Sequence, residues 1–133
     1  MILVDTNVLL DIATRDEIWF EWSARQLAPL IGNREAAINP VIYTELAPLY
    51  RDARDLDLNL VPPSDFRRLP LPYSCAFAAA RAFQAYRKDG GTRTSPLPDL
   101  FIGAHAEAEG LTLLTRDAKR YRTYFPKVKL ICP

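Results

Sequence analysis

Short, predominantly apolar runs that alternate with helical segments are the feature that most limits the fold of this chain. The first run is Ile2-Leu3-Val4, and comparable runs recur at 36–38, 111–115 and 128–131. A strand that reads as continuously apolar is buried on both faces, as in the parallel sheets of α/β proteins. The pattern therefore predicts an α/β fold: a short parallel sheet of four or five strands with helices on both faces.

The segments between these runs carry the signals of helices. Residues 17–31, 74–88 and 100–109 are the strongest helix candidates. In the first of them, a spacing near 100° per residue predicts a buried stripe of four residues and leaves Ile18 and Trp22 on the other side. The predicted stripe consists of Phe20, Ala24, Leu27 and Ile31.

The stretch 52–72 has a weaker pattern, because Asp, Leu and Pro are mixed in it without a clear period. We expect loops there, with a short helix near Asp65 and a short strand near Leu69.

Length and composition fit one globular domain over residues 1–133. Of these residues 49% are hydrophobic and 25% are charged, which is ordinary for a globular domain. Apolar runs stay well short of the ~18 residues that a membrane span needs, and Asp5 comes too early for a secretory signal. We therefore expect a cytoplasmic protein with no membrane partner. Cys75 and Cys132 have neither disulfide-framework nor zinc spacing and are expected to be reduced thiols.

A small net charge of +1 hides an asymmetry along the chain. Residues 1–80 carry seven bases and eleven acids, whereas residues 81–133 carry ten bases and five acids. The basic C-terminal part suits a polyanionic partner, although solvated helix faces would give the same count.

Four acidic residues stand where parallel strands end or helices begin. Asp5 ends the first strand, Glu45 lies in the helix after the second, Asp99 begins a helix and Asp117 follows the run 111–115. Ligands of such sheets bind outside the carboxyl ends of the strands, so we expect these carboxylates to converge. Each acid alone also fits capping or solvated-surface chemistry. Together they predict a site for Mg²⁺ or Mn²⁺, which prefer oxygen ligands.

Three stretches of the sequence resemble a PIN domain, and most of all the small VapC-type toxin ribonucleases. They are Ile2-Leu3-Val4-Asp5-Thr6-Asn7-Val8, the pair Thr44-Glu45, and Pro98–Ala104 leading into Leu113-Leu114-Thr115-Arg116-Asp117. The resemblance in element order covers essentially the whole chain.

This resemblance implies a metal-dependent endoribonuclease, the toxin of a type II toxin-antitoxin pair. By position, the family's acidic quartet that binds divalent metal and activates water corresponds to Asp5, Glu45, Asp99 and Asp117. Asn7 and Thr115 correspond to the polar residues that orient that quartet. The position of Asp117 varies in the family, so among the four acids Asp117 is the least certain metal ligand and is expected to act through water.

An RNA substrate needs basic residues beside the acidic site. The candidates lie in two groups, Arg116, Lys119 and Arg120 after the last strand-end acid, and Arg87, Lys88 and Arg93 around Gly90-Gly91. Solvated surface is the alternative for each of them, and Arg116 has the further alternative of pairing with a neighbouring acid.

Protein partners are expected as well. Ile18 and Trp22 lie off the predicted core stripe, which favours contact with a cognate antitoxin or with a second copy in a homodimer. Burial of Trp22 under a neighbouring helix is the alternative.

A second function remains open beside the nuclease. A non-catalytic PIN-like module would bind RNA or protein without cutting, but such a module would be expected to lose one or more carboxylates. A phosphatase with an aspartyl nucleophile is disfavoured, because Asn7 stands where its second Asp is usual.

Overall fold

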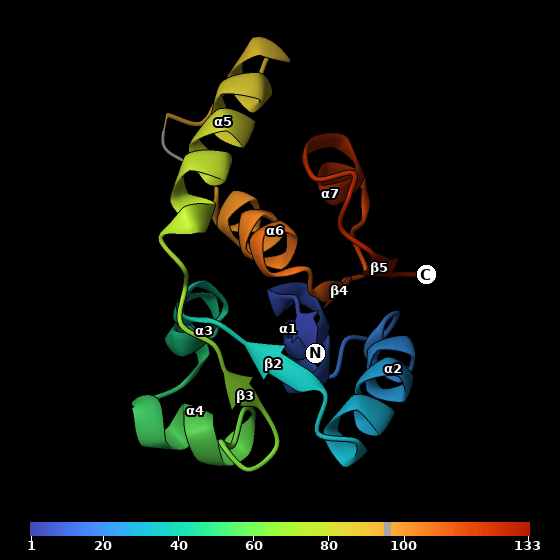
Figure 1. Ribbon diagram of the computed structural model, residues 1–133. Coiled ribbons are helices and arrows are strands. Elements are labelled where there is room, and N and C mark those ends of the chain that lie inside the picture. The colour runs from blue at the N-terminus through green and yellow to red at the C-terminus, as the bar shows by residue number, and fades with distance from the viewer. Residues whose placement is uncertain (95–96) are drawn as a thin grey trace.

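The computed structural model describes residues 1–94 and 97–133. One sheet of five parallel strands runs through this part of the chain in the order β3-β2-β1-β4-β5, with helices packed around it (Figure 1). The strands are β1 (Ile2–Val4), β2 (Ala36–Ile38), β3 (Arg67–Arg68), β4 (Thr112–Leu114) and β5 (Leu130–Ile131). The predicted α/β class and parallel sheet are confirmed.

Seven α-helices and one short 3-10 helix connect and cover the strands in the described residues. They are α1 (Thr6–Thr14), α2 (Phe20–Gly32), α3 (Pro40–Leu46), the 3-10 helix η1 (Ala47–Leu49), α4 (Ala53–Asn59), α5 (Ser74–Lys88), α6 (Pro98–Glu109) and α7 (Lys119–Tyr124). Figure 1 shows α4 beside β3, and α5 and α7 at the opposite end of the molecule from α4.

The register of the sheet brings the carboxyl ends of its central strands to one level. Leu3 of β1 faces Ala37 on one side and Leu113 on the other, and all three strands end one residue later. The residues that directly follow these neighbouring strands are Asp5 after β1, Asn39 after β2 and Thr115 after β4. Three polar side chains therefore start from the same edge of the sheet, where parallel α/β proteins bind ligands.

Capping explains why two helices begin at this edge. Asp5 accepts the Thr6 N–H at 2.7 Å at the start of α1. Asn39 accepts the Ile42 N–H at 2.9 Å at the start of α3, where Pro40 occupies the first helical position. Both residues satisfy helix donors that lack a partner within the helix.

Helix α6 is the centre of the packing. Its residues Leu100, Ile102 and Ala104 have no exposed surface, and the helix contacts α3, α5 and α7. Gly103 lies within it against the ring of Phe125, which is itself buried. Asp99, in the first turn of α6, is thus carried by the helix with the most buried residues.

The second helix differs from its prediction at its start and in its buried face. It begins at Phe20 rather than at residue 17, because Asp16 holds the preceding turn by accepting the Ile18 and Trp19 N–H groups. Its buried residues are Ser23, Leu27 and Leu30. Of the predicted stripe, Leu27 is buried and Ile31 packs partly buried against the core, whereas Phe20 and Ala24 are only partly exposed and lie outside the core cluster of the described residues. The Ser23 hydroxyl donates to the buried Asp11 carboxylate at 2.7 Å, a polar contact that hydrophobic spacing does not detect.

The stretch 52–72 also departs in part from expectation. The helix there is α4, capped by Asp52, whose carboxylate accepts the Asp55 N–H at 2.8 Å. Residues near Asp65 form a turn, so the short helix predicted there is wrong. The short strand is confirmed as β3, which ends directly before Leu69.

The state of the two cysteines agrees with expectation. Cys75 and Cys132 are both free thiols. Among the helices of the described residues, none combines the length and the apolar character that crossing a bilayer requires.

We predict that Gly103→Ala destabilises the protein by about 1–2 kcal/mol, although alanine favours helix by about 1 kcal/mol. The reason is that a Cβ at this position overlaps the buried Phe125 ring. Chemical denaturation measures the change. Gly32→Ala, at the exposed end of α2 with open space around it, is the matched control and should be neutral or stabilising. Equal effects of the two substitutions would contradict the packing argument.

Candidate active site

Asp5 accepts four hydrogen bonds at the carboxyl edge, two of them from residues distant in the sequence. One carboxylate oxygen, Oδ1, caps α1 through the Thr6 N–H. The other, Oδ2, accepts three side-chain hydrogen bonds, from the Thr115 hydroxyl at 2.8 Å, the Tyr121 hydroxyl at 2.9 Å and the Asn7 amide at 3.2 Å. Residues from α1, from the end of β4 and from α7 therefore fix this carboxylate in place.

Burial makes the charge of Asp5 unfavourable. The side chain is 3% exposed, and desolvation raises its pKa to about 7, against the lowering effect of the hydrogen bond from Thr115. The negative charge of Asp99 raises this pKa further, while the bonds from Tyr121 and Thr6 lower it. Because every one of these donors is neutral, the carboxylate has no positive charge to offset its own.

Thr6 links Glu45 to Asp5 through hydrogen bonds to both carboxylates. Oε1 of Glu45 accepts the Thr6 hydroxyl at 2.7 Å, while the Thr6 N–H binds Asp5. Glu45 is half-buried in α3, and burial raises its pKa, with the charge of Asp99 adding to the effect and the Thr6 bond opposing it. Thr6 therefore holds two carboxylates from different helices in a fixed relation.

Asp99 lies in the first turn of α6 and completes the group. Its charge raises the pKa of both Asp5 and Glu45, so Asp99 lies near enough to act electrostatically on both carboxylates. Its own Oδ2 accepts a hydrogen bond from Nη1 of Arg120 at 2.9 Å, in an ion pair whose side chains are 36% and 38% exposed. The accessible acid of the site is thus the one that has a cationic partner.

The structure brings together five of the six predicted site residues and leaves the carboxylate of Asp117 aside. Asn7 and Thr115 both contact Asp5, and the Asn7 amide also donates to the Thr115 hydroxyl at 3.1 Å. Asp117 donates its backbone N–H to the same hydroxyl at 3.1 Å, but its exposed side chain lines a separate cavity of about 510 Å³.

The carboxylate oxygens suit a hard divalent cation, although they lie too far apart in this structure to hold one. Asp5, Glu45 and Asp99 provide carboxylate oxygens, the ligands that Mg²⁺ and Mn²⁺ prefer. Within residues 1–94 and 97–133, no three acidic, His or Cys side chains are close enough together to hold a metal ion. Glu45 is bonded to Thr6 and Asp99 to Arg120, so a cation would have to draw these groups inward.

The basic residues predicted to contact RNA have different environments. Arg116 pairs with the buried Asp11, its Nε lying 2.9 and 3.1 Å from the two carboxylate oxygens, and its guanidinium stacks over Trp19. Its predicted alternative, pairing with an acid, is therefore confirmed. Lys119 and Arg120 line the same 510 Å³ cavity as Asp117, next to the acidic site.

The second basic group lies around the end of α5. Arg87 donates to the carbonyl oxygen of Arg93 at 2.7 Å, and both side chains are exposed together with Lys88. Gly90 and Gly91 form one border of the 510 Å³ cavity, so this group stands beside the cavity rather than in the acidic site.

The two residues predicted as a protein interface differ in exposure. Ile18 is 79% exposed. Trp22 is partly buried against the core of its own chain and meets Trp19 edge-on, with 6.1 Å between ring centroids. Ile18 therefore remains the exposed member of the predicted interface, while Trp22 contributes to the packing of its own chain.

Three contacts of the site were missed by the sequence reasoning. They are the Thr6 bridge between Asp5 and Glu45, the Tyr121 hydroxyl on Asp5, and the Arg120 pair with Asp99. Thr6 was detectable in principle, since it directly follows Asp5. The other two depend on how α7 lies on the edge of the sheet, which no local pattern reveals.

His105 connects the helices that carry Glu45 and Asp99. Its buried Nδ1 lies 2.9 Å from the amide nitrogen of Asn39, the cap of α3, and its Nε2 lies 3.2 Å from a carboxylate oxygen of Glu109. Since the amide nitrogen of Asn39 can only donate, Nδ1 is the acceptor and Nε2 carries the proton. Its role at this place is to join α6 to α3.

We predict that Asp5 makes stability depend on pH. A folded-state pKa of about 7, raised from 3.8, means that folding takes up a proton, so the free energy of unfolding falls as pH rises from 4 to 7. The fall should reach up to about 4 kcal/mol. Asp5→Asn removes this contribution. In chelator, the free energy of unfolding of the variant minus that of the wild type should therefore increase from pH 4 to pH 7. Parallel pH curves of the two proteins would contradict the assignment.

Solved structures with a similar fold come from toxin-antitoxin systems. VapBC2 from Rickettsia felis, solved with a DNA fragment from their promoter, has a TM-score of 0.71 and 21% identity, covering 100% of this chain and 99% of that one. FitAcB from Neisseria gonorrhoeae has a TM-score of 0.70 and 23% identity, covering 98% and 96%. A toxin-antitoxin complex from Klebsiella pneumoniae has a TM-score of 0.62 and 23% identity, covering 96% and 95%. These likenesses show the fold.

Sequence comparison identifies the family. No curated protein matches the chain by sequence. The family model of the PIN domain, in contrast, matches residues 2–126, nearly the whole length. The chain therefore belongs to the PIN-domain family.

Proposed function

We propose that this protein is a divalent-metal-dependent endoribonuclease that hydrolyses RNA phosphodiester bonds. The observation that carries the proposal is the group formed by Asp5, Glu45 and Asp99 at the carboxyl edge of a PIN domain. Thr6 is hydrogen-bonded to both Asp5 and Glu45, and the charge of Asp99 acts on both carboxylates. A group of this kind needs a cation to be fully ionised, and oxygen donors favour Mg²⁺ or Mn²⁺.

Each residue of the site has a proposed role. Asp5, Glu45 and Asp99 would hold the metal, which when bound supplies Lewis-acid chemistry that activates water and stabilises charge on the phosphate. Asn7 and Thr115 hold Asp5 in one orientation through their hydrogen bonds. We propose that Asp117 contributes through water, because its carboxylate lines the neighbouring cavity.

The RNA backbone is proposed to lie along the cavity beside the acidic site. Lys119 and Arg120 line this cavity and would bind phosphates, while Arg87, Lys88 and Arg93 extend the positive surface beyond it. Arg116 is not assigned to RNA, since it is bound to Asp11.

The partners are inferred from the fold neighbours. These neighbours include VapBC, FitAB and toxin-antitoxin complexes, which supports a cognate antitoxin for this chain and a role as toxin of a type II pair. A homodimer and an antitoxin contact at Ile18, beside Trp22, belong to the same proposal. We infer a cytoplasmic location, where the proposed RNA substrate would be available.

We predict that Asp99→Asn lowers the rate of RNA cleavage by more than about 100-fold, since it removes a proposed metal ligand. Asp117→Asn is the matched control, because Asp117 lines the neighbouring cavity outside the carboxylate group, and it should lower the rate less. Gel assays should use structured and single-stranded RNA, because proteins often recognise loops.

Three results would contradict this assignment. The reverse order of the two variants would overturn the ranking of the acids. Cleavage that persists in excess chelator, and is absent from the Asp5→Asn preparation, would reject the metal. RNA binding by the wild type with no cleavage of any RNA would favour the non-catalytic module.

We predict opposite effects of Arg120→Gln on metal and on RNA. The substitution removes the cation that competes for Asp99, so Mn²⁺ affinity should rise, while RNA affinity should fall with a salt slope smaller by about one unit. Lys119→Gln is the matched control. It lines the same cavity, and its variant should weaken RNA binding alone. A loss of metal affinity in Arg120→Gln would show that the ion pair supports the site instead.

A further inference from the structure

Arg120 lies where the acidic site meets the neighbouring cavity of about 510 Å³. Its Nη1 donates to Oδ2 of Asp99 at 2.9 Å, and the same residue lines the cavity. Its guanidinium carbon is 5.7 Å from the centroid of the Tyr86 ring, which also lines the cavity. One cation therefore contacts a carboxylate of the acidic site and an aromatic wall outside that site.

The ion pair between Arg120 and Asp99 is weakly held. In residues 1–94 and 97–133, the bond from Nη1 is the single hydrogen bond that either side chain makes. Both side chains are also partly open to solvent, at 38% and 36% exposure. Exposed ion pairs contribute little to stability, so the arginine can leave Asp99 with a small loss of free energy.

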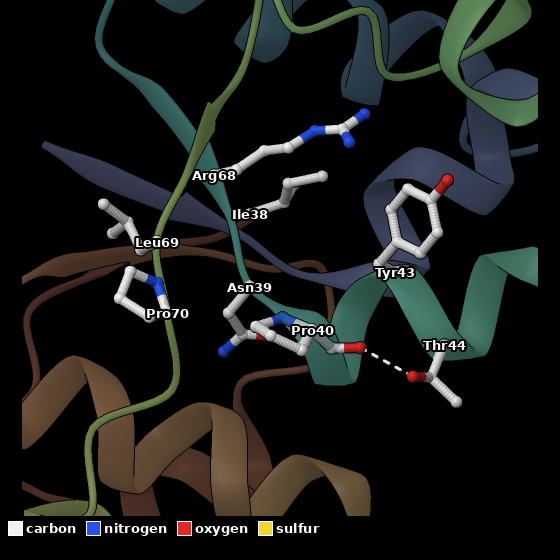
Figure 2. A pocket seen from close by; sticks show the side chains of 8 residues that line it. All are labelled: Ile38, Asn39, Pro40, Tyr43, Thr44, Arg68, Leu69 and Pro70. Carbon is white, nitrogen blue, oxygen red and sulfur yellow. Dashed lines mark hydrogen bonds between the residues drawn. The ribbon is translucent and has the colours of Figure 1, made fainter. Parts of the chain in front are cut away.

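The arginine of another cavity shows the contrasting arrangement. Arg68 stands on the rim of a cavity of about 450 Å³ over β2 and β3 (Figure 2). Its Nη2 is bonded both to the Asp57 carboxylate at 2.6 Å and to the Val61 carbonyl at 3.2 Å, and Asp57 also accepts the Tyr43 hydroxyl. These shared contacts fix Arg68 in the fold. Arg120 makes no second hydrogen bond within the described part of the chain.

The charges of the 510 Å³ cavity make Arg120 necessary for binding a phosphate there. Lys119 is the other cation among the lining residues, whereas Asp89 and Asp117 are anions. While the charge of Arg120 is offset by Asp99, one base faces two acids in the cavity, and this balance repels a phosphate. A phosphate that enters the cavity would therefore draw the guanidinium away from Asp99.

We propose that Arg120 exchanges between Asp99 and a phosphate of the RNA substrate, and thereby couples RNA binding to metal binding. When the arginine pairs with Asp99, it competes with a metal ion for that carboxylate. When a phosphate takes the arginine, Asp99 has no cation and favours a divalent one. A ligand that binds one of two arrangements more tightly shifts the population toward it, so each ligand strengthens the other. Arg120 is thus a positioning residue, and the inference rests on the proposed function.

The affinity for Mn²⁺ with and without a nucleic-acid strand measures this coupling independently of cleavage. Electron paramagnetic resonance follows free Mn²⁺ while the full chain is titrated, alone and with a saturating single-stranded DNA oligonucleotide, which carries the same phosphates as RNA. A strand of the same sequence with neutral methylphosphonate linkages is the matched probe, and titrations without protein correct for Mn²⁺ bound by each strand. We expect the charged strand to raise the Mn²⁺ affinity of the wild type at least about fivefold, and the neutral strand to leave it within about twofold.

Two variants separate the role of Arg120 from direct attraction between metal and phosphate. Without a strand, Arg120→Gln should bind Mn²⁺ more tightly than the wild type, because no cation competes for Asp99. Its gain on adding the charged strand should be at least about threefold smaller than that of the wild type, since only the direct attraction remains. Lys119→Gln changes the other cation of the cavity, and at saturating strand its gain should stay within about twofold of the wild type.

Several outcomes would overturn the proposal. An equal gain in the wild type and Arg120→Gln would show that the arginine binds phosphate without leaving Asp99, or does not bind it. No binding of the charged strand, or the same gain with the neutral strand, would reject the phosphate. RNA cleavage by the wild type together with an equal gain in the two proteins rejects this inference alone. A gain that depends on Arg120, with no cleavage of any RNA, rejects the nuclease and keeps the exchange.

Discussion

The burial of one carboxylate at the end of the central strand is the constraint around which this structure is arranged. Asp5 ends β1, which has β2 on one side and β4 on the other, so the residue is enclosed by both neighbours and by the helix that it caps. Its four hydrogen bonds come from Thr6, Asn7, Thr115 and Tyr121, which lie in α1, after β4 and in α7. Segments far apart in sequence are thus fixed by contact with the same two oxygens.

A comparison with Asp11 shows what is unusual about Asp5. Both are almost fully buried, at 1% and 3% exposure. Asp11 has Arg116, whose guanidinium pairs with it directly, and the Ser23 hydroxyl besides. Asp5 has neutral donors, and the nearby charge that acts on it, that of Asp99, is negative. A buried charge without a cationic partner is unfavourable, so the first arrangement serves stability and the second favours a function that brings a cation.

The arrangement of the fold was predictable where sequence pattern is local and repeated. The apolar runs fixed the class of the sheet, and α5 has the predicted bounds, residues 74–88. Helix α4 was missed because its start depends on capping by Asp52 and it buries only Leu56. The face of α2 was misread because a buried Ser23–Asp11 contact replaces the apolar spacing on which the prediction relied.

The site was predictable only to the extent that strand ends define it. Asp5 and Asp99 were selected from their places at the end of a strand and the start of a helix, whereas Thr115 was selected only through the family resemblance. Contacts across the edge were not predicted, because Arg120 and Tyr121 reach the site only through the way α7 packs on α6. Asp117 shows the converse. Its place in the sequence suggested a ligand, yet its side chain faces the adjoining cavity.

Calorimetric titration of Mn²⁺ into the purified protein tests the central claim most directly, because it measures the cation that the acidic group is proposed to hold. The wild type should bind Mn²⁺ saturably, Asp5→Asn should bind it more than about tenfold more weakly, and Asp117→Asn should stay close to the wild type. Equal affinity in the wild type and Asp5→Asn, with both variants folded, would contradict the account.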